Sequence, residues 1–127
     1  MTGTLLFHNT MRIREGHLDE FRAAVVKAVA FVRDHGPQLM VEVFIDAEAM
    51  RAHSFQLYAD DESVLEHWQL SDPHIREVME HCTVERFEVF GAPGEQVRAG
   101  LRTPSGEPFP TTITPRLTGF TRMATSR

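Results

Sequence analysis

The order of helical and strand patterns constrains the fold of this 127-residue chain more than any other feature. Apolar residues at three- and four-residue steps predict a helix over residues 17–35, and Gly36-Pro37 ends it. A second helix begins near residue 60, Ser71-Asp72-Pro73 is expected to break it, and a short helix over 74–81 follows. Alternating or continuous apolar runs predict strands over residues 4–14, 38–46, 53–58 and 84–90. This order is typical of an α+β, ferredoxin-like βαββαβ fold with an antiparallel sheet.

The last 36 residues differ from the rest of the chain. Residues 92–127 hold two acids and five bases, so residues 1–91 hold 16 acids (18 − 2) and 8 bases (13 − 5). We therefore expect a domain over 1–91 and an extended C-terminal arm over 92–127, lying across its own sheet or that of a second copy. A disordered tail is the alternative. The prolines that prevent a helix here are Pro104, Pro108, Pro110 and Pro115. The apolar residues that could anchor the arm are Ile113, Leu117, Phe120 and Met123.

Two of the predicted strands, 38–46 and 84–90, carry apolar residues on both faces. The two helices of a ferredoxin-like domain cover only one face of its sheet. The other face then needs either the arm or a second copy of the chain. A homodimer that shares sheet faces is the simplest solution.

Charge and composition exclude several classes of function. A net charge of −5 with no cluster of Lys and Arg argues against a nucleic-acid partner. No apolar run approaches the ~20 residues of a membrane span, and no basic segment precedes an apolar one at the N-terminus. We therefore expect a cytoplasmic protein without a membrane partner. The single cysteine, Cys82, allows neither an internal disulfide nor a cysteine-based zinc site.

Several short motifs follow one another along the chain in the order that is typical of one family. They are Arg14-Glu15-Gly16-His17, Leu18-Asp19-Glu20-Phe21, Leu57-Tyr58-Ala59-Asp60, His67-Trp68-Gln69-Leu70-Ser71-Asp72-Pro73-His74 and Phe87-Glu88-Val89-Phe90. Through them residues 5–90 resemble the antibiotic-biosynthesis-monooxygenase-like family of dimeric α+β barrel proteins. The chain departs from the family pattern at Tyr58, where Trp is usual, and at Asp72, which is inserted into a Ser-Pro-His motif.

The resemblance implies one of several chemistries. The family includes quinone-forming monooxygenases without cofactors, haem-degrading oxygenases and polyketide cyclases. The position that matches the haem ligand is Val78, which cannot bind iron, and His74 and His81 are the possible replacements. Of the three activities, haem degradation is therefore the one that the sequence favours least.

Eight residues are candidates for the site. An amide in the middle of a strand, at Asn9, could hold a substrate carbonyl or a developing oxyanion, or could simply bond to nearby backbone. One of several histidines would serve as base near neutral pH. Trp68 would form a wall for a planar ligand, or would be ordinary core packing. The catalytic candidates are Asn9, His53, His67 and His74, and the substrate-binding candidates are Gln56, Tyr58, Trp68 and His81.

We therefore expect a cofactor-independent monooxygenase that acts on a small phenolic or quinol-like aromatic compound, with no bound flavin and no metal. An electron-rich phenolate can pass an electron to dioxygen itself, so the protein need only bind, deprotonate and shield the substrate. A polyketide cyclase on the same fold, with a histidine base and no oxygen consumed, is the alternative enzyme. A non-catalytic ligand-binding domain is the third possibility.

Overall fold

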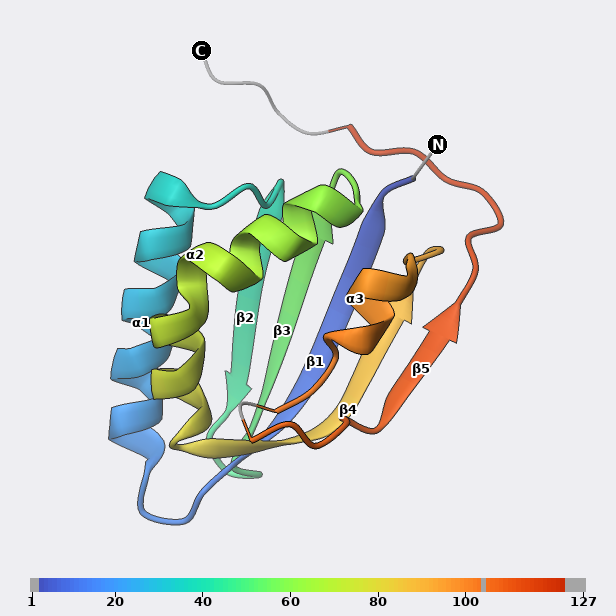
Figure 1. Cartoon of the computed structure of the whole chain (residues 1–127). Helices are drawn as coiled ribbons and strands as arrows, with labels where there is room; N and C mark the ends of the chain where they lie inside the picture. The colour runs from blue at the N-terminus through green and yellow to red at the C-terminus, as the bar shows by residue number, and fades with distance from the viewer. Residues whose placement is uncertain (1–2, 104, 123–127) are drawn as a thin grey trace.

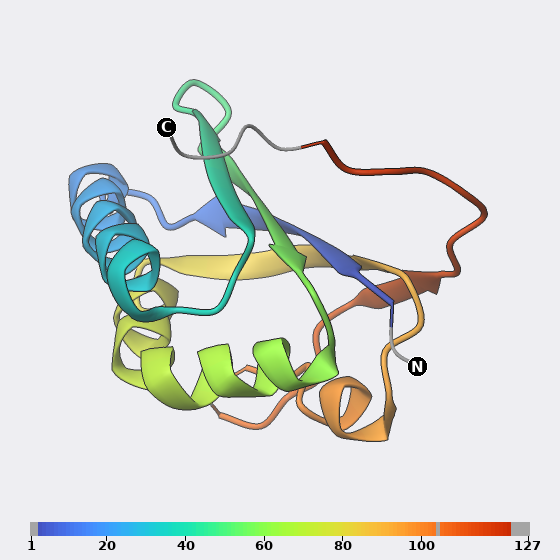
Figure 2. The ribbon, with the colours of Figure 1, turned by 90° about the horizontal axis from the view of Figure 1, so that it is seen from above.

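The patterned segments form strands and helices in the order expected from the sequence. The computed structural model describes residues 3–103 and 105–122. Figure 1 shows a twisted sheet with its helices on one side, and Figure 2 shows the same arrangement from above. The elements are β1 (Leu5–Ile13), α1 (Leu18–His35), β2 (Met40–Asp46), β3 (Arg51–Tyr58), α2 (Asp61–Met79), β4 (Cys82–Phe90), α3 (Glu95–Ala99) and β5 (Thr111–Thr114).

The first six elements confirm the α+β, ferredoxin-like βαββαβ order. The strands form one sheet in the order β2-β3-β1-β4-β5, and β1 pairs antiparallel with both β3 and β4. The last strand lies outside the ferredoxin-like core and pairs in parallel with β4. Strand β3 begins at Arg51, two residues earlier than its alternation indicates, because a short turn joins it to β2.

Helix α1 follows the predicted stripe closely. Phe21, Ala24 and Val32 on that stripe are buried against the sheet, and acids occupy the first turn, where the helix dipole favours them. The helix ends at Gly36, whose backbone N–H donates to the Val32 carbonyl over 2.7 Å.

The predicted break at Pro73 was wrong. Helix α2 runs through it without interruption from Asp61 to Met79. A proline removes one backbone hydrogen bond and bends a helix, but packing on both sides can keep the helix continuous. In Figure 1 the two halves of α2 run in clearly different directions.

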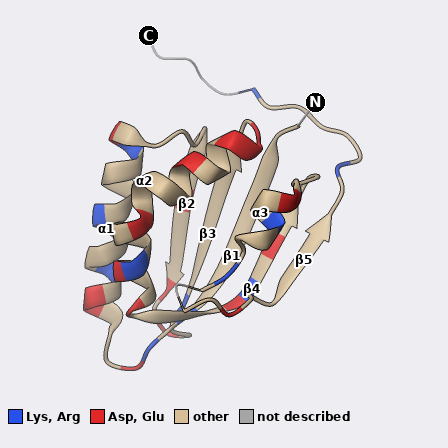
Figure 3. Cartoon of the chain, in the orientation of Figure 1, with Lys and Arg blue, Asp and Glu red and all other residues tan. Residues whose placement is uncertain are grey.

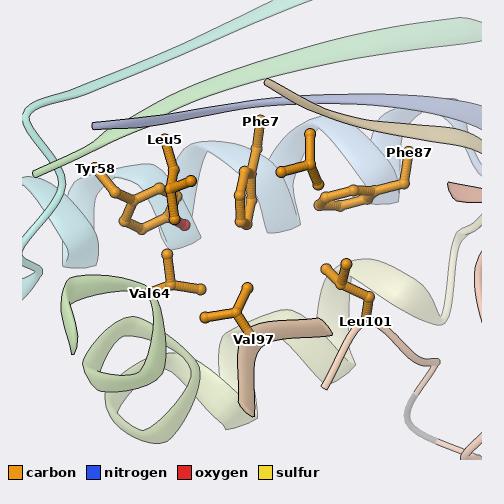
Figure 4. Packing of buried hydrophobic residues seen from close by; sticks show 8 residues of the cluster. Leu5, Phe7, Tyr58, Val64, Phe87, Val97 and Leu101 are labelled. Atoms are coloured by element: carbon orange, nitrogen blue, oxygen red, sulfur yellow. The ribbon is translucent and has the colours of Figure 1, made fainter. Parts of the chain in front are cut away.

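The beginning of the C-terminal extension joins the main core. Val97 of α3 and Leu101 pack in one cluster with Leu5, Phe7 and Tyr58 of the sheet. In Figure 4 the strand side chains point from one side and the extension side chains from the other. Beyond this point, β5 pairs with β4 and forms one edge of the sheet. The division into a domain over 1–91 and an extension over 92–127 stays a prediction, and Met123 lies outside the described residues.

A β-bulge in β4 changes which side chains point away from the helices. Thr10 faces Arg86 and Met11 faces Val84, so Glu85 has no partner in the ladder. Strict alternation predicts Glu85 on the side of Phe87, but the bulge turns it to the opposite face. There its carboxylate bonds to Arg51 Nε over 2.8 Å and to Arg12 Nε over 3.2 Å.

None of the described segments packs as a layer on the side of the sheet away from the helices, and we call that side the open face. Figure 2 shows α1, α2 and α3 together on the other side. The strand registers place on the open face Leu6, His8, Thr10, Arg12, Glu42, Phe44, Arg51, His53, Phe55, Leu57, Glu85, Arg86, Glu88 and Phe90. The homodimer expected from the sequence would use this surface.

Candidate active site

A cavity of about 130 Å³ lies between the sheet and the two long helices. Helix α1, helix α2 and strand β2 supply most of its walls, which are largely valine, isoleucine and methionine side chains. No Asp, Glu, Lys or Arg side chain within the described residues lines it. A cavity of roughly 150 Å³ in another protein holds benzene, so this one has room for about one aromatic ring. Its polar groups are Asn9, Gln38, Ser54, Gln56, His67, Ser71 and His74.

The Gln56 amide is held at both ends. Its Oε1 accepts hydrogen bonds from the Tyr58 hydroxyl and, over 3.3 Å, from Gln38 Nε2. Its Nε2 donates to Ser54 Oγ over 3.3 Å. Burial raises the pKa of Tyr58 above its ordinary value, so its hydroxyl remains a donor. Gln56 is therefore fixed in orientation by its neighbours.

Two residues that line the cavity carry an amide oxygen without a hydrogen-bond partner. Asn9 Oδ1 and Gln38 Oε1 are both buried, and neither has a hydrogen-bond partner within the described part of the chain. An unpaired buried acceptor costs ~1–3 kcal/mol, and such atoms are rare in folded proteins. Because neither oxygen has accessible surface, a ligand hydroxyl would meet it only after the amide side chain turns toward the cavity.

His67 is the buried titratable group of the cavity, with 7% of its surface exposed. Its Nδ1 lies 3.0 Å from the Oγ of Ser71, one helical turn later in α2. Burial lowers the pKa of His67 to about 4, so the ring is neutral at pH 7. A neutral imidazole can accept a proton at one nitrogen and donate at the other. His74 lies at the same wall, with its ring 4.5 Å from that of Phe31.

Four of the eight candidate residues line the cavity: Asn9, Gln56, His67 and His74. Tyr58 does not, but it reaches the cavity indirectly by holding Gln56. The sequence analysis missed Gln38, Ser54 and Ser71. Ser54 could have been found, because alternation puts it on the same face as Gln56, and Ser71 follows His67 by one helical turn. Gln38 precedes β2, where no periodicity marks it.

Trp68 does not line this cavity. Its side chain packs against the C-terminal extension. A Cβ atom added at Gly100 would lie only 2.3 Å from the Trp68 ring. The helix turns Trp68 about 100° away from His67, so adjacent residues face different neighbours. The alternative of core packing therefore describes Trp68.

The remaining two histidines are also outside the cavity. His53 lies on the open face, where its Nδ1 is 3.0 Å from Nε2 of His8. His8 in turn lies 3.0 Å from the Glu88 carboxylate. His81 lies beyond the end of α2, and its Nδ1 is 3.0 Å from Nδ1 of His17. His81 therefore does not share the cavity with His74.

The described residues contain neither a cluster of metal-binding side chains nor a helix suited to cross a membrane. No three His, Cys, Asp or Glu side chains among them come together as a metal-binding group. None of the helices in the described part of the chain has the length and apolar character that crossing a membrane requires. Val78, where the resemblance would put a haem ligand, lines the cavity as an apolar wall residue.

Comparison with known proteins finds matches only among solved structures. No family model matches the sequence, and no curated protein matches it. MupZ from Pseudomonas fluorescens shares 18% identity with a TM-score of 0.76, over 98% of this chain and 99% of MupZ. SnoaB, a cofactor-independent oxygenase from Streptomyces nogalater, shares 15% identity with a TM-score of 0.60, over 72% of this chain and 95% of SnoaB.

A candidate antibiotic biosynthesis monooxygenase from Chloroflexus aurantiacus shares 14% identity with a TM-score of 0.60. That match covers 72% of this chain and 95% of the other protein. At these identities the likeness concerns the fold. The chain therefore has the fold of the antibiotic-biosynthesis-monooxygenase-like proteins, as its sequence motifs indicated.

Proposed function

We propose that the chain is a cofactor-independent monooxygenase that acts on a phenolic or quinol-like compound, with one ring in the cavity. The observation that carries this proposal is an apolar cavity whose lining residues include neutral His67 and two with unpaired amide oxygens, Asn9 Oδ1 and Gln38 Oε1. A dihydroxylated ring offers one hydroxyl to an amide acceptor and a second hydroxyl to His67. The fold shared with SnoaB, which is named as a cofactor-independent oxygenase, supports the same class of reaction.

The chemistry begins with proton removal from a substrate hydroxyl. One amide oxygen accepts a hydrogen bond from a substrate hydroxyl and orients the ring, and His67 takes the proton of a second hydroxyl. His67 by itself is a weak base, because burial lowers its pKa, but a phenolate beside it raises its pKa through opposite charge. Ser71, 3.0 Å from Nδ1, fixes the ring of His67.

The phenolate then reacts with dioxygen directly. It passes one electron to dioxygen, and the two radicals combine at a hydrogen-bearing ring carbon opposite or next to the hydroxyl, which gives a hydroperoxide. Loss of water leaves one oxygen atom on that carbon, so a phenol and dioxygen give a quinone and water. The apolar walls exclude bulk water from the intermediates.

Oxygen uptake tests this proposal. Purified protein is supplied with single-ring phenols and hydroquinones while dissolved oxygen and quinone absorbance are followed. We expect His67→Gln to lower kcat by about 100-fold or more, because it removes the base. His17→Gln, a histidine substitution outside the cavity, should retain full activity. Absence of oxygen uptake with every member of the panel would contradict the proposal.

A polyketide cyclase is the second candidate, and the His67–Ser71 pair favours it. An uncharged acid–base pair in an apolar cavity suits enolisation, in which His67 removes a proton from carbon and an amide group holds the enol oxygen. Ring closure of a polyketide without oxygen uptake would select this activity. Ligand binding without either reaction would instead indicate a non-catalytic binding domain.

A further inference from the structure

The cavity has an amide end and an opposite end lined by methionine, which we call the thioether end. The sheet register pairs Gln56 with Phe7 and Ala52 with Met11, so the levels of Gln56 and Met11 are four residues apart along β1. At ~3.3 Å per residue, this separation is ~13 Å. Gln38 bonds to Gln56 and so belongs to the amide end. Met11 lies at the other end of the same cavity.

Helix α2 follows the same polarity. His67 lies in its first half, and the centre of its ring is 6.2 Å from that of Tyr58. Met79 is the last residue of the helix and packs in the same apolar cluster as Met11. The proposed base therefore lies toward the amide end, and two methionine side chains line the thioether end.

Met11 is accessible through the cavity and hardly at all from the surface. Only 4% of its surface is exposed. Met40 differs, because it is half-buried and lies on the open face, where it pairs with Leu57. Figure 3 marks acids and bases along α1 and α2, but none of the charged residues described for this chain lines the cavity. The uncharged walls favour an uncharged oxidant at Met11, such as an organic hydroperoxide.

The proposed reaction forms a hydroperoxide of this kind on the ring. The hydroxyl that gives its proton to His67 lies toward the amide end, so the ring carbon opposite it is directed toward Met11 and Met79. The cavity of about 130 Å³ has room for about one ring. A peroxide group on that carbon therefore meets the thioether end.

We propose that Met11 is a site of oxidation inside the cavity, where a hydroperoxide formed or bound at the thioether end transfers one oxygen atom to its sulfur. The sulfur attacks the terminal peroxide oxygen, the O–O bond breaks, and the proton of that oxygen passes to the oxygen left on carbon. The thioether loses two electrons and becomes a sulfoxide, and the hydroperoxide is reduced to an alcohol. The inference rests on the proposed reaction as the natural source of the hydroperoxide.

Oxidation of Met11 has a consequence for activity. A sulfoxide is polar, whereas the thioether that it replaces is apolar and flexible. The oxidised end of the cavity is then less suited to an apolar ring. Each turnover that oxidises Met11 instead of releasing water therefore inactivates the protein.

Peptide mass spectrometry of the native chain tests the site. The protein turns over single-ring phenols in air, with catalase present to remove free hydrogen peroxide, and sulfoxide is measured at each methionine. We expect Met11 to be oxidised at least about tenfold faster than Met40, because the oxidant forms inside the cavity. Hydrogen peroxide without phenol and without catalase is the control, and it should oxidise Met40 before Met11.

Two substitutions connect the oxidation with activity. Met11→Leu keeps nearly the same side-chain volume but has no sulfur. The number of turnovers before half of its own initial activity is lost should therefore be at least about threefold higher than for the native chain. Met40→Leu, the matched substitution on the open face, should lose activity as the native chain does.

A compact hydroperoxide separates this site from the proposed reaction. tert-Butyl hydroperoxide is uncharged and should enter the cavity and oxidise Met11 ahead of Met40 without any phenol. Oxygen uptake that leaves Met11 unoxidised would overturn the inference and keep the proposed reaction. Faster oxidation of Met40 than of Met11 by tert-butyl hydroperoxide would also overturn the inference. Oxidation of Met11 by tert-butyl hydroperoxide in a protein that takes up no oxygen would support the site and remove only the proposed reaction.

Discussion

Replacement of His67 by glutamine should make the protein less sensitive to acid. The His67 ring is buried, and burial lowers its pKa to about 4 from the ordinary value of 6.5. Between these two values the unfolded chain binds a proton at this residue and the folded chain does not. The free energy of unfolding therefore falls as the pH decreases from 6.5 toward 4. Above pH 6.5 the contribution of neutral His67 to this free energy is fully present.

The size of this effect follows from the two pKa values. Each pH unit between them changes the free energy of unfolding by at most about 1.4 kcal/mol. Between pH 7 and pH 5 the contribution of His67 amounts to about 2 kcal/mol. Burial also lowers the pKa of His8, which adds a loss of the same sign, so the informative quantity is the difference between two chains.

Urea unfolding at pH 7 and pH 5 measures this difference. Trp68 is the single tryptophan, so its fluorescence reports on unfolding in every variant. When the pH is lowered from 7 to 5, the free energy of unfolding of the native chain should fall by about 2 kcal/mol more than that of His67→Gln. His17→Gln controls for removal of a histidine outside the cavity and should keep the acid sensitivity that His67 causes. Equal losses in the native chain and in His67→Gln would refute the assignment of His67 as a buried neutral base.

Three further substitutions test other parts of the structure. Asn9→Leu removes an unpaired buried amide, so it should raise the free energy of unfolding by ~1 kcal/mol, measured by urea unfolding. The same substitution should weaken phenol binding, measured by calorimetry. A lower free energy of unfolding would mean that the amide has hydrogen-bond partners. Gly100→Ala should lower the free energy of unfolding by ~1–3 kcal/mol, because its Cβ would lie 2.3 Å from the Trp68 ring. Gly3→Ala, which meets nothing within 4 Å, is the control, and equal stability of the two would show that Trp68 moves freely. Asp60→Ala removes the cap that accepts from the Ser63 N–H over 2.8 Å, so thermal unfolding should show a loss of ~1 kcal/mol that Asp60→Asn largely avoids.

Local periodicity was sufficient to predict most of the secondary structure. The apolar stripe of 17–35 and the alternation near Met11 and Ile13 reflect which face of each element is buried, and this pattern is written in consecutive residues. Two exceptions have a common cause. Pro73 remains helical and Glu85 changes faces because contacts with distant segments offset the local preference.

The sequence by itself determined the α+β order of the elements, the uncharged apolar character of the helix-facing side and the amide at Asn9. It did not determine which polar residues share a cavity. Asn9, Gln38, Gln56 and His67 come from four separate segments, and they meet only through the sheet register and the packing of α2 on it. His67 and Trp68 are neighbours in the chain but face different surfaces, because one helical step turns the side chain by about 100°. Only the tertiary structure could decide which of the two faces the cavity.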